Sequence, residues 1–147
     1  MTTMTTGDIG FVIDLYHNSL NPFACGNAQP IKPLWSHRDD VTLANPFGPA
    51  VVGWKNVSDA MDFASSRFKN GSVTIVNTIA KYESPELVTI LETENWKAEI
   101  GGRQEVSSKV LRVTSTFRYE DGEWKLVHRH ADPINSFNPD GPLRGGE

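Results

Sequence analysis

The sequence has little cysteine and no long hydrophobic run, and both absences limit what the chain can be. Cys25 is the only cysteine among 147 residues, which excludes an internal disulfide framework and a cysteine-rich zinc site. No apolar run approaches the roughly 18 residues that a membrane-spanning helix needs. The first residues lack the basic and apolar segments of a signal peptide. We therefore expect a cytoplasmic protein with no membrane partner.

Positive charge is also scarce. Fourteen Lys and Arg residues stand against 18 Asp and Glu residues, which gives a formal net charge of −4. Such a balance disfavours binding to nucleic acids or anionic membranes. The sequence contains neither the Walker nor the dinucleotide type of glycine-rich phosphate loop. We therefore expect no nucleic-acid partner and no cofactor.

The composition is that of one globular domain. The length suits a single domain, and 38% hydrophobic residues, with four Trp among the aromatics, are enough for a core. We predict one domain over residues 7–133. Residues 1–6 and 134–147 are predicted to be irregular tails, the second because it is rich in Pro and Gly.

The first half of the chain has the periodicity of helices. Apolar residues spaced as one helix face predict a first helix, and they are Ile9, Val12, Ile13, Tyr16 and Leu20. A short second helix is predicted around residues 31–35. A third is predicted from an N-cap at Ser58 to Phe68. A small hairpin, with strands at 41–43 and 50–53, precedes the third helix.

From residue 73 the period changes from 3.6 to 2, which predicts strands. Four long strands follow one another with short connections, at 73–82, 87–98, 107–119 and 123–130. The last connection, Asp121-Gly122, is a strong hairpin signal. Helices followed by a meander predict an α+β fold. We expect a strongly curved, mostly antiparallel sheet wrapped around three helices, forming a cone with an internal pocket.

Several segments resemble one family of small proteins. They are Leu34-Trp35-Ser36-His37-Arg38-Asp39-Asp40-Val41-Thr42-Leu43, then Asn45-Pro46-Phe47-Gly48, then Gly53-Trp54, and the ending from Phe117-Arg118-Tyr119 to His130. The chain resembles the SnoaL-like and ketosteroid-isomerase-like proteins of the nuclear transport factor two-like superfamily, the cystatin-like cone. The resemblance covers roughly residues 8–133. It implies the fold, a small-molecule pocket and a homodimer paired through the convex side of the sheet, but no single reaction.

The resemblance also places three residues at positions that matter in ketosteroid isomerases. Tyr16 stands where those enzymes have a donor to the oxyanion, and Asn45 stands where they have the Asp base. Ser115, two residues before Phe117, stands where they have a protonated Asp. Because Asn cannot abstract a proton, the resemblance argues against ketosteroid isomerisation by the usual Asp base.

Two histidines on the last predicted strand are the strongest candidates for chemistry. Strict alternation places Trp124, Leu126, His128 and His130 on one face, and the resemblance implies that this face is concave. Histidine titrates near neutral pH, which suits proton transfer. Asp132 could orient one ring. The alternative is that one or both are ordinary polar residues hydrogen-bonded to a neighbouring strand.

These observations define the predicted site. The predicted catalytic residues are His130, His128, Tyr16 and Asp132. The predicted substrate-binding residues are Asn45, Ser115, Phe117, Trp124 and Leu126.

Two further interpretations concern acidic side chains and metal. Glu92 and Glu94 share a strand face with apolar residues, and a buried Glu must be paired or protonated. One of them could be an acid facing the histidines, or their face could lie in solvent or in a dimer contact. His-x-His is also a metal-ligand spacing, but no recognised motif supplies further ligands, so we predict no metal.

The predicted function follows from the histidine pair and the resemblance. We expect a cofactor-independent general acid/base enzyme of the isomerase, cyclase or dehydratase type, acting on a small hydrophobic, polyketide- or steroid-like molecule. The alternative is a non-catalytic ligand-binding or dimerisation module on the same fold, for which loss of the Asp base is expected.

Overall fold

A computed structural model describes residues 8–141 of the chain. The elements are α1 (Ile9–Phe23), the 3₁₀ helix η1 (Lys32–Leu34), β1 (Thr42–Ala44), β2 (Val51–Val52), α2 (Trp54–Ser66), β3 (Phe68–Glu83), β4 (Leu87–Ile100), β5 (Val106–Glu120) and β6 (Glu123–Asp132). The predicted second helix is a single 3₁₀ turn. The predicted third helix begins at Trp54 rather than at Ser58, because Gly53, with φ of 91°, ends the preceding strand and caps the helix.

The sheet contains six strands in the order β2-β1-β6-β5-β4-β3. The four long strands form the predicted antiparallel meander, and β1 joins it in parallel with β6. Glu120 pairs with Glu123 across the hairpin between β5 and β6. Asp121 and Gly122 have φ of 53° and 81° there, as a two-residue primed turn requires.

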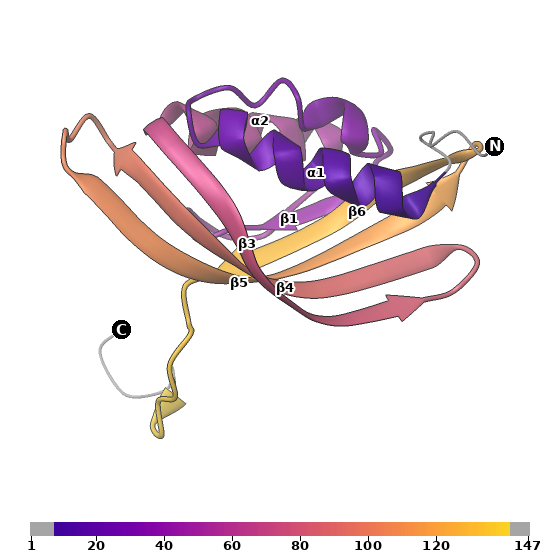
Figure 1. Ribbon diagram of the computed structural model, residues 1–147. Helices are drawn as coiled ribbons and strands as arrows, with labels where there is room; N and C mark the ends of the chain where they lie inside the picture. The colour runs from indigo at the N-terminus through magenta and orange to yellow at the C-terminus, as the bar shows by residue number, and fades with distance from the viewer. Residues whose placement is uncertain (1–7, 142–147) are drawn as a thin grey trace.

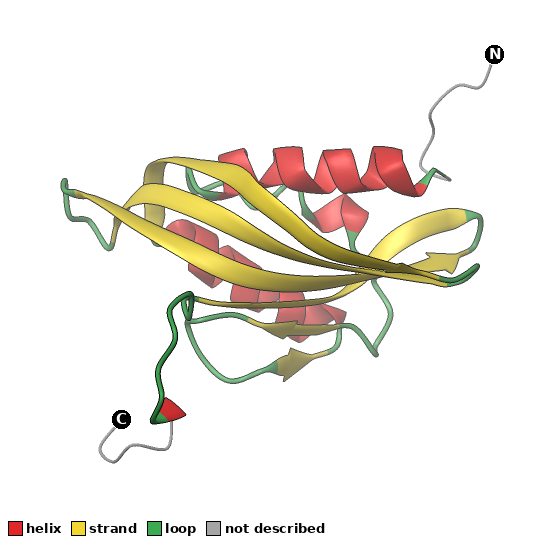
Figure 2. Ribbon diagram, turned by 60° about the horizontal axis from the view of Figure 1, so that its bottom comes forward, coloured by secondary structure: helices red, strands yellow, loops and turns green. Residues whose placement is uncertain are grey.

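Both α-helices lie on the same face of the sheet, and the opposite face is uncovered by any described element (Figures 1 and 2). The α+β class is therefore confirmed, but two details of the prediction are wrong. The described chain has two α-helices rather than three, and the sheet is not strongly curled around them. Because two helices are enough to cover one face of the sheet, the sheet does not need to curl around a third.

Burial alternates regularly along β4 and along the second half of β5. On β4, Ile90, Glu92 and Glu94 face the helices and are buried, whereas Thr89 and Leu91 lie half-buried on the outer face. The core between sheet and helices includes Val12, Tyr16, Leu20, Trp35, Val57, Phe117 and Leu126. This alternation identifies the inner face of each strand.

The alternation is interrupted on β6 by a β-bulge. Thr116 pairs with His128, but the next residue of β5, Phe117, pairs with Leu126. Val127 is therefore an extra residue on β6 with no partner of its own. A bulge of this kind shifts all following side chains to the opposite face.

The consequence is that the last part of β6 presents different residues inward than strict alternation predicts. Leu126 before the bulge and Arg129 after it are both buried, and Arg129 pairs with the inward-facing Ser115. His128 and His130 are directed to the uncovered face. The prediction that these histidines lie on the concave face is therefore wrong.

The chain beyond β6 leaves the sheet on the side away from the helices (Figure 1). Between residues 133 and 141 it forms no strand, and Ile134 and Phe137 are exposed. The predicted tail at 1–6, and residues 142–147 of the second, lie outside the described residues. Within 8–141, no helix is long and apolar enough to cross a membrane.

Candidate functional site

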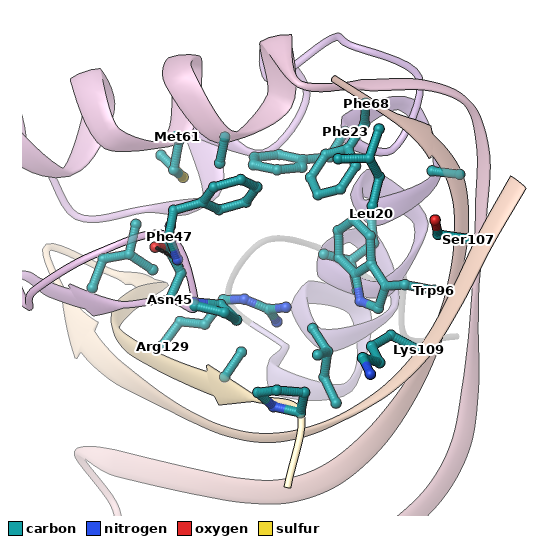
Figure 3. Close-up of a pocket in the computed structure, with 18 of the residues that line it drawn as sticks. Leu20, Phe23, Asn45, Phe47, Met61, Phe68, Trp96, Ser107, Lys109 and Arg129 are labelled. Atoms are coloured by element: carbon teal, nitrogen blue, oxygen red, sulfur yellow. Dashed lines mark hydrogen bonds between the residues drawn. The ribbon is translucent and has the colours of Figure 1, made fainter. Parts of the chain in front are cut away.

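A cavity of about 420 Å³ lies between the helices and one end of the sheet (Figure 3). Its walls come from both α-helices, from the turn after β1 and from β3 to β6. Most of the lining is apolar, and includes Leu20, Phe23, Leu43, Phe47, Met61, Ala64, Phe68, Trp96, Ile100 and Leu111. Such a cavity suits the body of an apolar ligand.

Few polar side chains line the cavity. Within the described chain they are Asn45, Ser107, Ser108, Lys109 and Arg129, besides the indole of Trp96. Asn45 accepts a hydrogen bond from the backbone N–H of Phe47 at 3.1 Å, which holds the turn after β1. Lys109 is exposed, whereas Arg129 is only 7% exposed. Arg129 is therefore the buried charged group of this cavity.

Arg129 is held by a buried carboxylate on β4. Its Nη1 donates to Glu94 Oε2 at 2.9 Å and its Nη2 to Glu94 Oε1 at 2.7 Å. Trp96 Nε1 also donates to Glu94 Oε1, at 2.9 Å. Glu94 is completely buried, so the two-point contact with Arg129 is what allows this carboxylate to remain charged inside the protein.

Tyr16 extends this network towards α1. Its hydroxyl accepts a hydrogen bond from Arg129 Nη1 at 2.5 Å and lies 2.6 Å from Ser115 Oγ. The Tyr16 ring packs edge-on against Phe117, with 5.5 Å between centroids. Three residues predicted for the site, Tyr16, Ser115 and Phe117, therefore come together beside Arg129.

The pKa values of the network follow from burial and pairing. Burial raises the pKa of Tyr16 to about 12, against the opposing effect of Arg129. Burial alone would raise the pKa of Glu94, but the charge and hydrogen bonds of Arg129 outweigh it and the pKa is lowered. The pKa of Arg129 is raised, because Glu94 and Tyr16 outweigh its burial. The network at neutral pH is thus a neutral phenol beside an ion pair.

Arg129 keeps hydrogen-bonding capacity for a ligand. Of its five N–H groups, two on Nη1 and one on Nη2 are used by Tyr16 and Glu94. No described residue accepts from Nε–H or from the other N–H of Nη2. Since the guanidinium points into the cavity (Figure 3), these two donors are available to an oxygen atom of a bound molecule.

A second buried carboxylate, Glu92, lies on the same face of β4. His17 Nε2 is 2.8 Å from its Oε1, and Thr78 Oγ1 donates to its Oε2 at 3.1 Å. Glu92 does not line the cavity. The sequence left open whether these two carboxylates face the histidines, solvent or a dimer contact. Both are buried and partnered, and they face His17 and Arg129 rather than His128 and His130.

The predicted histidine pair lies away from the cavity. His128 Nδ1 is hydrogen-bonded to Thr42 Oγ1 of the neighbouring strand at 2.7 Å. The side chain of His130 is 55% exposed, with Nε2 3.7 Å from Asp132 Oδ2. Asp132 instead accepts from Arg112 Nε at 2.6 Å and from Arg112 Nη2 at 3.2 Å. The arrangement matches the alternative weighed for this pair, that of polar residues bonded to a neighbouring strand.

The remaining predicted residues divide between cavity and core. Asn45 lines the cavity. Leu126 is completely buried, and Trp124 is half-buried against Tyr119 with 5.3 Å between ring centroids, but neither of them borders the cavity. Sequence reasoning missed Arg129, for which the signal was the cost of burying Glu94 without a cation.

The His-x-His spacing gains no further metal ligands in the described part of the chain. Between residues 8 and 141, no three His, Cys, Asp or Glu side chains gather as a metal site. The two rings lie 6.5 Å apart, centroid to centroid.

Comparison with known proteins defines the family. The model of the SnoaL-like domain matches residues 12–134, so the chain belongs to the SnoaL-like domain family, and the resemblance inferred from sequence is confirmed. A search of curated proteins gave no significant match.

Solved structures of similar fold agree with this assignment. An NTF2-like superfamily protein from Salmonella enterica serovar Typhimurium has a TM-score of 0.78 at 13% identity, covering 97% of this chain and 96% of its own. A ketosteroid isomerase-like protein from Erwinia carotovora has 0.70 at 14%, covering 87% and 95%. A protein with a cystatin-like fold from Caulobacter vibrioides has 0.69 at 19%, covering 90% and 89%. At these identities the likeness concerns the fold alone.

Proposed function

We propose that this protein binds a mostly apolar small molecule in the cavity, with an oxygen atom of the ligand accepting hydrogen bonds from Arg129. The observation that carries the proposal is an apolar cavity of about 420 Å³ with one buried charged side chain that has unused donors. Small-molecule sites combine these features, since apolar walls supply affinity and a few polar groups fix orientation.

The walls favour a flat or ring-containing ligand. Phe23, Phe68 and Trp96 cluster on one side, with 5.3 Å between the centroids of Phe68 and Trp96 and 6.1 Å between those of Phe23 and Trp96. Apolar surface buried against them contributes about 25 cal/mol per Å². Aromatic faces add geometric preference for another ring. This lining supports a small hydrophobic ligand.

An acid/base enzyme on the same cavity is the second candidate. It is favoured by the fold shared with a ketosteroid isomerase-like protein and by the hydrogen bond of Tyr16 to Arg129, although Tyr16 is completely buried and does not itself line the cavity. However, Tyr16 has a pKa of about 12, and Arg129 keeps the pKa of Glu94 low. Efficient general acid/base catalysis favours a group whose pKa lies near the working pH. Neither Tyr16 nor Glu94 changes its protonation state near neutral pH. The geometry therefore supports ligand binding better than proton transfer.

The binding of an apolar body in the cavity is tested with N-phenyl-1-naphthylamine, an uncharged molecule without oxygen whose fluorescence increases in apolar surroundings; the contact with Arg129 is tested with an oxygen-bearing ligand in the next subsection. We expect saturable binding to the natural chain. Ala64→Phe fills part of the cavity from α2, and we expect it to raise the Kd about tenfold or more. Ser66→Phe adds the same ring to an exposed position of the same helix and should leave the Kd unchanged.

Binding that persists in a folded Ala64→Phe variant contradicts the proposal. If that variant fails to fold, Leu111→Trp fills the cavity from β5 instead, and the same comparison applies. Absence of any saturable binding to the natural chain also contradicts the proposal.

A further inference from the structure

The charge balance at Arg129 indicates which chemical group reaches the inner end of the cavity. We propose that the cavity selects ligands whose inner end is an uncharged acceptor, such as the carbonyl of a ketone, ester or amide, and excludes carboxylates from that position. The inference rests on the proposed function, because it specifies the ligand of the same site.

The available donors suit a single oxygen atom. Nε–H and the unused N–H of Nη2 belong to one planar guanidinium, and the described residues give neither a partner. A carbonyl oxygen has two lone pairs and can accept from both. The shape of the donor pair alone does not discriminate, however, because a carboxylate fits two parallel N–H groups equally well.

Charge discriminates where shape does not. Glu94 is completely buried and binds Arg129 through both of its oxygens, so the positive charge that would attract an anion is already neutralised. A ligand carboxylate at this position would lose its hydration and meet a neutral pair with another carboxylate on its far side. A buried anion without its own counter-charge is strongly disfavoured, whereas a hydrogen-bonded carbonyl is not.

Lys109, the other cationic side chain that lines the cavity, is not buried as Arg129 is. Lys109 is exposed, and it borders the cavity on β5. An anionic group on a ligand therefore has a solvated partner at Lys109 rather than at Arg129. The two sites together orient a ligand with its neutral carbonyl inward and any charged group outward.

The test compares two molecules with the same apolar body, 2-acetylnaphthalene and 2-naphthoate. Titration calorimetry at neutral pH on the natural chain should give a Kd for the ketone at least about tenfold below that for the carboxylate. Glu94→Gln keeps the shape of the side chain and removes its charge. In that variant we expect the preference to reverse, with the carboxylate bound about tenfold more tightly than the ketone.

The natural chain alone can overturn the inference, since naphthoate that binds as tightly as the ketone and has its carboxylate at Arg129 contradicts it. A second measurement on the natural chain follows the Arg129 Nε–H resonance in NMR spectra. This resonance should shift on addition of the ketone and not on addition of naphthoate, whether or not the Glu94→Gln variant folds. The two proposals fail separately. If N-phenyl-1-naphthylamine does not bind, the proposed function fails. If it binds and both naphthyl compounds displace it equally, only the charge selectivity fails.

Discussion

Arg129 determines both the polarity of the cavity and part of the stability of the core. It is buried, lies on a strand otherwise lined inward by Leu126 and Ala131, and forms a two-point ion pair with Glu94. A buried ion pair can be weakly stabilising overall, yet removal of one member leaves an uncompensated charge. Replacing Arg129 alone should therefore lower the free energy of unfolding much more than replacing Arg129 and Glu94 together.

Arg129→Met should lower the free energy of unfolding by about 3–5 kcal/mol, because Glu94 is left buried and unpaired. The double substitution Arg129→Met with Glu94→Leu removes both charges and should be clearly more stable than the single variant. Chemical denaturation measures both. Arg112→Met, which breaks an exposed pair with Asp132, should change stability by about 0–1 kcal/mol. Equal losses in the single and double variants would contradict the account of the pair.

Protonation of His128 should make the stability of the protein depend on pH. Burial, and secondly the neighbouring His130, lower the pKa of His128 below 6.5. The folded state therefore binds this proton less readily than the unfolded state, and stability falls as the pH drops below 6.5 towards the lowered folded pKa. Above 6.5 both states are neutral and the effect is absent.

His128→Asn should reduce the loss of stability on acidification below pH 6.5, as measured by the denaturation midpoint across this range. His37→Asn, at an exposed histidine whose ring stacks on Trp54 of α2, serves as the control for loss of an imidazole elsewhere. A natural chain and a His128→Asn variant with the same pH profile would show that His128 is not desolvated.

At the scale of elements, the bulge in β6 decides which residues form the site. The strands of the meander were predictable, since period-2 patterns and the Asp121-Gly122 turn mark them locally. The same alternation groups Ile90, Glu92 and Glu94 on one face of β4, but it does not say whether that face points inward. The extra residue Val127 has no local signature, because a bulge depends on how β6 pairs with β5. Strict alternation consequently directed His128, rather than Arg129, to the inner face.

The candidate site was partly predictable for physical reasons that differ between residues. Tyr16 lies on the apolar stripe of α1, so its burial follows from helical periodicity. Asn45 is placed by the turn after β1, which local sequence marks. The sequence shows that Glu94 needs a partner if it is buried, but not whether it is buried, and the partner lies 35 positions further on in sequence. Long-range pairing of this kind is decided by the assembled sheet.

Gly71 lies at a close approach between elements, so its replacement should be destabilising. Gly71 lies where β3 is irregular, against the chain that follows α1 and against β4. An added Cβ would meet the backbone oxygen and Cβ of Ala24, and would lie 2.9 Å from the Cβ of Ala98. Since these are backbone and rigid atoms, Gly71→Ala should reduce stability by about 1–3 kcal/mol.

Denaturation of the Gly71→Ala variant tests this packing between α1, β3 and β4. Gly48→Ala is the control, because an added Cβ there meets no atom within 4 Å, and it should be close to neutral. If both substitutions have the same small effect, the close approach at Gly71 is not as tight as described.

At the level of the whole molecule, the two faces of the sheet are covered differently. The inner face carries the helices, the core and the cavity. The outer face is uncovered by any described element (Figure 2) and presents half-buried Thr89, Leu91, Thr116 and His128. We propose that two copies of the chain pair through this face, as the family resemblance implies.

Leu91→Arg places a charge at the centre of the proposed interface and should convert a dimer to a monomer in light-scattering measurements. Because the cavity lies on the other face, binding of N-phenyl-1-naphthylamine should be retained. Ser66→Arg, on α2, should leave the oligomeric state unchanged. A natural chain that is monomeric at all concentrations, or a Leu91→Arg variant that is still dimeric, contradicts pairing through this face.

A crystal structure of the protein with 2-acetylnaphthalene would show whether the cavity beside Arg129 is a ligand site. We expect the naphthyl rings between the aromatic walls near Trp96 and Phe68, with the ketone oxygen within hydrogen-bonding distance of Arg129 Nε. A ligand found instead on the uncovered face beside His128 and His130, or a cavity closed by its own side chains, would contradict the claim.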